Sequence, residues 1–167
     1  AFLGDKGTAE GEPTECALVN WAASLNQKKD ALEAASPRVG EAPFDSGRKR
    51  MSTLHRTEDG SIVQYTKGAP DEVLRYCDSY LDAAGQEKPL TPEIRAAIVK
   101  DNTRMAAQAL VVMPGGRRRW DALPETSDPA VLEQHVSCLG LAGMIAPVRA
   151  EAVEAVRQCR EAGIRLF

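Results

Sequence analysis

Apolar residues recur at helical spacing in four stretches of the chain, each bounded by residues typical of helix ends. A proline stands at the first helical position of three of them, and a glycine follows the last. The pattern predicts helices over about residues 13–35, 70–77, 91–110 and 149–162. In the last of these, Val153, Val156 and Cys159 share one side and are expected to face a core.

Three further stretches have the composition of β-strands. Residues 51–57 and 61–67 are short extended runs separated by an Asp-Gly turn, which is a strong hairpin signal. Residues 137–145 are typical of a buried strand, whereas prolines, glycines and a run of arginines predict a loop over 114–129. A hairpin with helices inserted between strands indicates an α+β fold, with a twisted antiparallel β-sheet flanked by helices.

The C-terminal end has a different pattern. A helix followed by residues 164–167 is typical of the first half of a βαβ unit whose next strand is missing. A final strand without a partner predicts that the sequence is a fragment of a longer protein.

Composition and charge narrow the class of protein. The chain has 167 residues, of which 43% are apolar and 27% charged, as in one globular domain with an ordinary core. A formal net charge of −3 gives no general attraction to nucleic acid, so any anion site must be local. The longest apolar stretch, 139–148, is too short for a membrane-spanning helix, and the first residues do not resemble a signal peptide.

The cysteines and histidines do not predict a metal site. Cys16, Cys77, Cys138 and Cys159 are far apart without a CxxC pair, and the two histidines stand alone. Scattered cysteines of this kind are expected to be small buried side chains in a reducing compartment.

Three motifs occur in order and carry a family resemblance. They are GEPTECALV at 11–19, PFDSGRKRMS at 43–52 and TKGAPDE at 66–72. They resemble the GDPTEGAL, PFDSERKRMS and KGAPE motifs of the nucleotide-binding domain of P-type cation-transporting ATPases, in the branch that includes the calcium pumps. LGLAGMI at 139–145 followed by APVR at 146–149 is similar to the strand and DPPR hinge that lead into the phosphorylation domain of that family.

The second motif makes chemical sense as a nucleotide site. Phe44 precedes a cluster of three cations, Arg48, Lys49 and Arg50, so that an aromatic face can stack on a base while cations reach its phosphates. The residues alone leave a second interpretation open, in which Phe44 is a core residue and the cations form a solvated face. The resemblance favours the nucleotide site.

The resemblance implies a set of ATP-binding residues. The aromatic residue stacks on adenine, the lysine of the third motif lies deep beside it, and the acidic residue of the first motif contacts the base. Gly68 and Ala69 lack bulk, so the backbone there can approach a ligand, although the same four residues can also be a plain strand-to-helix turn. The ATP-binding positions are expected to be Glu15, Phe44, Lys49, Met51, Lys67, Gly68 and Ala69.

The chain departs from the family at several positions. Val111 stands where the family has an arginine that contacts ATP phosphates, and Ala146 and Val148 replace an aspartate and a proline of the hinge. Residues 5–8 (DKGT) differ in order from the phosphorylated DKTGT motif and are expected to form a surface turn, and no GxxxxGK[ST] loop occurs. The arginines at 117–119 are expected to lie in a solvated loop.

The predicted function is therefore the cytoplasmic ATP-binding domain of a P-type cation pump, with residues 1–145 as that domain and 146–167 as the hinge and the start of the phosphorylation domain. The intact pump would be a membrane enzyme that uses Mg-ATP and phosphorylates an aspartate outside this chain. Expected partners are ATP and the phosphorylation and actuator domains, without nucleic acid, and the fragment is expected to be monomeric and unable to hydrolyse ATP. The alternative is a non-catalytic interaction domain of the same fold that has lost the nucleotide.

Overall fold

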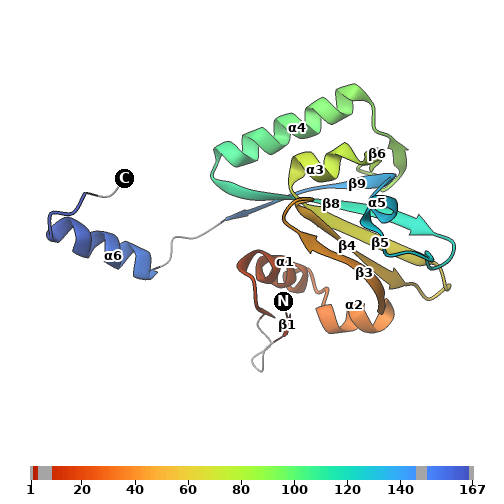
Figure 1. The fold of residues 1–167 in the computed structure, drawn as a ribbon, viewed down its shortest axis with the longest axis horizontal. Helices are drawn as coiled ribbons and strands as arrows, with labels where there is room; N and C mark the ends of the chain where they lie inside the picture. Colours follow the sequence, from red (N-terminus) through yellow and green to blue (C-terminus); the bar gives the residue numbers. More distant parts are fainter. Residues whose placement is uncertain (1, 4–8, 146–149, 166–167) are drawn as a thin grey trace.

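A mixed β-sheet with helices on both faces forms the body of the chain, of which a computed structural model describes residues 2–3, 9–145 and 150–165 (Figure 1). The strands are β1 (Phe2–Leu3), β2 (Ala9–Glu10), β3 (Arg38–Asp45), β4 (Arg50–Arg56), β5 (Ile62–Gly68), β6 (Cys77–Leu81), β7 (Glu87–Pro89), β8 (Leu110–Trp120) and β9 (Val136–Ile145). The helices are α1 (Pro13–Ser24), α2 (Lys29–Ala35), α3 (Pro70–Arg75), α4 (Pro92–Ala107), α5 (Pro129–Leu132) and α6 (Ala150–Glu161).

The main sheet has seven strands in the order β3-β4-β5-β8-β9-β6-β7, and β1 pairs separately with β2. Neighbouring strands are antiparallel except β6 and β9, which run parallel. The α+β class is confirmed, with the correction that the sheet is mixed. The parallel pair arises because α4 and β8 return the chain to the same end of the sheet before β9 begins.

The predicted hairpin is confirmed as β4 and β5. Asp59 organises its turn, because its carboxylate accepts hydrogen bonds from the Ser61 amide at 3.0 Å and from the hydroxyls of Thr57 and Ser61. Gly60 adopts a φ of 85°, a conformation that favours glycine. The turn therefore sets the register in which Met51 pairs with Lys67.

The prediction of a loop over residues 114–129 is wrong for 114–120, which belong to β8. Pairing with β5 on one side and β9 on the other outweighs the local signal of proline and glycine. Gly116 suits this position because a Cβ atom there would lie 2.4 Å from Cγ1 of Val136. Arg118 is also not a solvated loop residue, since its guanidinium stacks 3.7 Å from the centre of the Trp120 ring and donates to two backbone carbonyls.

Two helix predictions need correction and two are confirmed. The helix expected over 13–35 is two helices, α1 and α2, separated at Asn26, which adopts a φ of 60°. The helix predicted over 70–77 ends at Arg75, and Cys77 begins β6. The long helix α4 is confirmed, with the Thr91 hydroxyl accepting from the Ile94 amide as an N-cap, and β9 and α6 lie where the sequence placed them.

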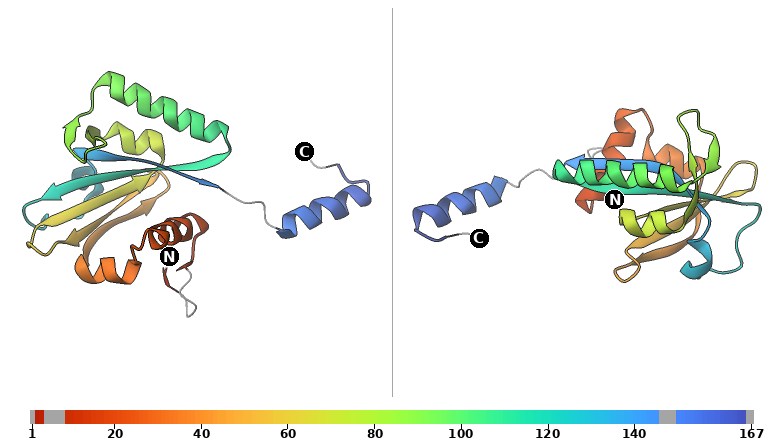
Figure 2. Two further views of the ribbon diagram at one scale, coloured as in Figure 1. Left: turned by 180° about the vertical axis from the view of Figure 1, so that it is seen from behind. Right: turned by 90° about the horizontal axis from the view of Figure 1, so that it is seen from above.

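The core lies on one face of the sheet, beneath α3, α4 and α5 (Figures 1 and 2). One cluster joins Val73 and Leu74 of α3 to Cys77, Val136 and Cys138, and a second joins Leu132 of α5 to the β3–β5 region. The predicted burial of the cysteines is confirmed for Cys77 and Cys138, whereas Cys16 and Cys159 are only half-buried. The opposite face carries α1 and α2, which have no buried residues.

The C-terminal helix α6 lies apart from the sheet (Figures 1 and 2). Val153 and Val156 are exposed, so the predicted inward side of this helix faces no core within the described chain. Residues 164 and 165 are not in a strand. The predicted hinge at 146–149 and the turn at 5–8 lie outside the described residues.

Candidate functional site

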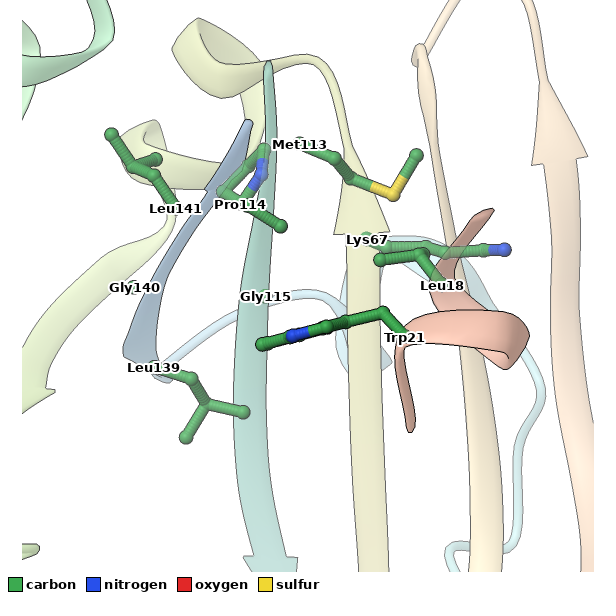
Figure 3. A pocket seen from close by; sticks show the side chains of 10 residues that line it. Leu18, Trp21, Lys67, Met113, Pro114, Gly115, Leu139, Gly140 and Leu141 are labelled. Atoms are coloured by element: carbon green, nitrogen blue, oxygen red, sulfur yellow. The ribbon is translucent and has the colours of Figure 1, made fainter. Parts of the chain in front are cut away.

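Cavities separate α1 from the sheet face that it covers. One, of about 590 Å³, lies between α1 and the β4–β5 hairpin and is lined by Glu15, Met51 and Lys67 among others. A second, of about 290 Å³, lies on the β8–β9 side of Lys67. Figure 3 shows this second cavity, with Trp21 extending from α1 toward β8. Lys67 lines both cavities and so occupies the centre of the site.

Glu15 and Lys67 join the helix to the sheet through an ion pair. Both side chains are about one-third exposed. The hydrogen bond from Lys67 is the main reason that the pKa of Glu15 falls from its usual 4.5 to about 2. A carboxylate that is ionised at neutral pH therefore holds the ammonium group between the two cavities.

Met51 and Lys67 are cross-strand neighbours, and Lys67 in turn pairs with Gly115 of β8. Residues on one face of a strand alternate with those on the other, so Met51 and Thr53 of β4 line the same cavity as Lys67 of β5. Three of the predicted ATP-binding residues, Glu15, Met51 and Lys67, are thus brought together.

A β-bulge places Phe44 opposite Met51 on the neighbouring strand, although Phe44 is not among the residues that line the two cavities. Ala42 pairs with Ser52 and Asp45 with Arg50, which leaves Pro43 and Phe44 together opposite Met51. Bulges re-aim side chains and are frequent beside functional sites. Phe44 is 61% exposed, so it is not a core residue, and the alternative that gave it a core role is wrong.

Lys49 lies at the end of the tight turn that follows β3. Asp45 holds this turn, because its carboxylate accepts hydrogen bonds from the amides of Gly47 and Arg48 at 3.0 and 2.9 Å. Lys49 itself adopts a φ of 53°, in the left-handed region, and its side chain is exposed. The turn therefore presents Lys49 to solvent at the end of β3 that carries Phe44.

The two arginines of the cationic cluster are engaged elsewhere. Arg48 and Arg50 both bond to Glu133, which is fully buried on the opposite side of the sheet from α1. The expectation that all three cations reach phosphates is wrong for these two, because both guanidinium groups bond to Glu133, and Arg50 also pairs with Glu72. Lys49 is the cation of this cluster that stays directed to solvent.

Gly68 and Ala69 have structural roles at the end of β5. A Cβ atom on Gly68 would lie 2.3 Å from the carbonyl oxygen of Lys49, so glycine is needed for the backbones to approach. The Ala69 amide donates to that same oxygen at 2.9 Å, and Ala69 precedes Pro70 at the start of α3. The strand-to-helix turn therefore packs directly against the Lys49 turn.

Val111 lies at the other end of the site. It precedes Gly115 by four residues on β8, which corresponds to about 13 Å along a strand. Strand alternation puts Val111, Met113 and Gly115 on one face, and Val111 is 45% exposed. Arg117 continues this face beside Tyr65, whereas Arg118 points to the other side of the sheet.

The apolar wall of the site was missed by sequence reasoning. Leu18, Trp21, Met113 and Leu139 line the second cavity. Leu18 and Leu139 lie within recognised motifs, but none of the four is among the predicted ATP-binding residues. Leu18 and Trp21 share one side of α1 at helical spacing, but this spacing does not show whether that side lines a core or a cavity. Glu133 was also missed, because no local pattern indicates that a carboxylate so distant in sequence meets the 43–52 motif.

Residues 4–151 match the family described as P-type ATPase, cytoplasmic domain N. The match covers most of the chain, and the site geometry agrees with the three motifs, so the chain belongs to the P-type cation ATPase family and corresponds to its cytoplasmic N domain.

The relatives are named cation or calcium pumps. The chain is 37% identical over 164 residues to a calcium-transporting ATPase of Listeria monocytogenes, which covers 98% of this chain and 18% of that protein. It is 37% identical over 155 residues to calcium-transporting ATPase 1 of Bacillus cereus, covering 93% of the chain and 17% of the relative. A calcium-transporting ATPase of Bacillus subtilis is 35% identical over 156 residues, covering 93% and 17%. The chain thus spans less than a fifth of the length of these relatives.

The described part of the chain contains neither a membrane-spanning helix nor a cluster of metal ligands. Within residues 2–3, 9–145 and 150–165, no helix has the length and apolar character needed to cross a bilayer. Among these same residues, no group of three or more His, Cys, Asp and Glu side chains is placed to hold a metal ion.

Proposed function

We propose that this domain binds ATP in the space between α1 and the β4-β5-β8-β9 face of the sheet. The observation that supports this most is the placement of Glu15, Met51 and Lys67, from three different elements, around one cavity. Each stands at a position where the family motif carries an ATP-binding residue. The bulge that sets Phe44 opposite Met51 adds an exposed aromatic face to the same site.

The chemistry of the lining suits a nucleotide. Apolar side chains from α1, β8 and β9 supply a dry wall for a flat base, and Lys67 supplies a positive charge at its centre. Phe44 can stack on the base, while Lys49 is free of the Glu133 network and directed to solvent, where phosphates would extend. Because the base makes most of the contact, ADP is expected to bind nearly as well as ATP, without a requirement for Mg²⁺.

The parent protein would be a membrane-bound P-type cation-transporting ATPase that uses Mg-ATP. In it, this domain would lie on the cytoplasmic side and present the γ-phosphate to an aspartate in a phosphorylation domain outside this chain, with an actuator domain as a further partner. Residues 1–145 would form the nucleotide-binding domain, and 146–167 the hinge and the first part of the phosphorylation domain.

Titration of the chain with ATP, followed by NMR, tests the proposal. Amide shifts are expected to change for residues of β4, β5 and α1, and Phe44→Ala should weaken binding by about 1–3 kcal/mol through the lost stacking. Val99→Ala is the matched control, because Val99 is an exposed apolar residue of α4, on the opposite side of the sheet.

The second candidate is an interaction domain that has lost the nucleotide. Val111 favours it, since an apolar side chain stands where the family has a phosphate-binding arginine. Saturable shifts confined to the α1 face would refute this candidate, and the absence of any shift at millimolar ATP would refute nucleotide binding.

A further inference from the structure

Glu133 lies at the centre of a buried ionic network. It directly follows the short helix α5, and no part of it is exposed to solvent. Its carboxylate accepts hydrogen bonds from Arg48 Nη1 at 2.7 and 2.6 Å and from Arg50 Nε at 2.7 Å. Such charge-assisted bonds are stronger than neutral ones, and losing one partner of a buried pair leaves an uncompensated charge.

Arg48 connects this carboxylate to the backbone beside Phe44. While its Nη1 atom donates to Glu133, its Nη2 atom donates to the carbonyl oxygen of Pro43 at 2.7 Å. Pro43 is the residue before Phe44 and forms the bulge with it. A planar guanidinium donates in fixed directions, so one side chain holds the bulge at a set distance from Glu133.

Arg50 holds the other end of the same turn. Besides Glu133, it contacts Glu72 of α3 at 3.2 Å and lies 4.1 Å from the centre of the Tyr76 ring. Its side chain is 7% exposed. Lys49, between the two arginines, is therefore anchored on both sides while its own side chain stays exposed.

From this geometry we propose that Glu133 is a positioning residue of the nucleotide site, acting through Arg48 and Arg50 on Phe44 and Lys49. The inference rests on the proposed ATP binding, which these two residues would serve. Glu133 itself faces away from the α1 cavities and touches no nucleotide. It acts by keeping the 43–50 segment in one conformation before the ligand arrives, which lowers the ordering cost of binding.

The central variant is Glu133→Gln, which keeps the size of the side chain and removes its charge. The chain with this change should bind ATP about three- to tenfold more weakly than the parent, since coupled neighbouring residues commonly interact by amounts of that order. Amide shifts of residues 43–50 should also change in the free protein, which reports the turn without any ligand. Leu132→Val is the matched control, because Leu132 is the adjacent, equally buried residue of α5 and bonds to neither arginine through its side chain.

A double-mutant cycle separates positioning from general destabilisation. In a Phe44→Ala, Lys49→Ala background, Glu133→Gln should weaken ATP binding by less than twofold, because the groups it positions are already gone. If Glu133→Gln does not fold, Arg48→Lys serves instead, since lysine cannot bond at once to Glu133 and the Pro43 carbonyl in the guanidinium geometry. The Arg48 side chain is 26% exposed, so its replacement disturbs the core less than a change at the fully buried Glu133.

The outcomes distinguish this inference from the proposed function. A parent chain that binds no ATP refutes the function and the inference with it. A parent that binds, together with a Glu133→Gln chain of unchanged affinity, refutes only the inference. An equal loss in Leu132→Val, or a full loss in the Phe44→Ala, Lys49→Ala background, also overturns it.

Discussion

At the scale of single residues, the ion pair between Glu15 and Lys67 predicts a particular pH dependence. The pKa of Glu15 is about 2 in the folded chain and near its ordinary 4.5 when unfolded, so the pair stabilises the fold above pH 4.5. That contribution is lost as the pH falls from 4.5 to about 2, because the unfolded chain then takes up the proton first. Urea unfolding of the parent and Glu15→Gln across this range measures the difference.

The parent should be more stable than Glu15→Gln at neutral pH, with a gap that closes as the pH approaches 2. In a Lys67→Met background the gap should be smaller, because the hydrogen bond that contributes most to the lowered pKa is gone. A gap that stays constant with pH would show that Glu15 stabilises the fold by packing alone.

Val111 offers a test of how the site binds phosphates. Replacing it with arginine should strengthen ATP binding by about 0.5–1 kcal/mol, because a charged hydrogen bond in an open cleft is weakened by solvent. The gain should be larger for ATP than for adenosine, which has no phosphates. Calorimetric titration of Val111→Arg, Arg117→Ala and the parent checks this.

Arg117 is the nearest arginine on the same face of β8, but it lies six residues and so about 20 Å from Val111 along the strand, and Arg118 bonds to carbonyls on the other side of the sheet. No gain from Val111→Arg together with a clear loss from Arg117→Ala would show that the alignment with the family fails at Val111.

The sequence predicted part of the site at this scale. The motifs correctly indicated that Glu15, Met51 and Lys67 lie close together, since all three line one cavity. A motif shared with a family implies the fold of that family, and the fold fixes which motif residues are neighbours. The sequence could not show that Arg48 and Arg50 are held by a buried carboxylate, since Glu133 lies in a different part of the chain. Charge in a sequence indicates a cation but not its partner.

At the scale of elements, the two adjacent glycines of β8 should respond differently to alanine. A Cβ atom on Gly116 would lie 2.4 Å from Val136, which is buried, whereas one on Gly115 would find its nearest atom at 3.7 Å. Gly116→Ala should therefore destabilise the domain by about 1–3 kcal/mol through overpacking. Gly115→Ala should have no cost or stabilise by about 0.4–1 kcal/mol, since it restricts the unfolded chain.

Urea unfolding of both variants measures these changes in the free energy of unfolding. The comparison is well controlled, because the residues are neighbours in one strand and receive the same methyl group. An equal loss of stability in the two variants would mean that any side chain at 115 or 116 destabilises β8, and that contact with Val136 is not the cause.

The elements that the sequence identified correctly have strong local signals. The Asp-Gly turn of the β4–β5 hairpin and the Thr-Pro start of α4 define their elements through nearby residues alone. The error at 114–120 comes from tertiary context, whereas the break at Asn26 is a local helix end, in which the amides of Asn26 and Gln27 donate to the carbonyls of Ala23 and Ala22. In β8, pairing with strands on both sides overrides proline and glycine, and no propensity of single residues contains that information.

At the scale of the whole molecule, the chain should bind ATP without forming a phosphoenzyme. Phosphoryl transfer needs a nucleophile in line with the γ-phosphate and metal-holding carboxylates, which the family places in the phosphorylation domain. Incubation with γ-labelled ATP and Mg²⁺, followed by acid precipitation, should leave no label on the chain. Acid-stable label on Asp5 would contradict this and assign phosphorylation to the DKGT segment.

The uneven burial of the two sheet faces has a consequence for how fast the domain opens. Amides in β4, β5 and β8 are protected by pairing on both sides, so their hydrogen exchange requires unfolding of the sheet. The helices α1 and α2 bury no residue fully, so they can detach in a local opening of much smaller free energy. A small molecule can thus enter beneath α1 while the sheet stays folded, and the residence time of a ligand held by both Glu15 and Lys67 would be set by the frequency of that opening.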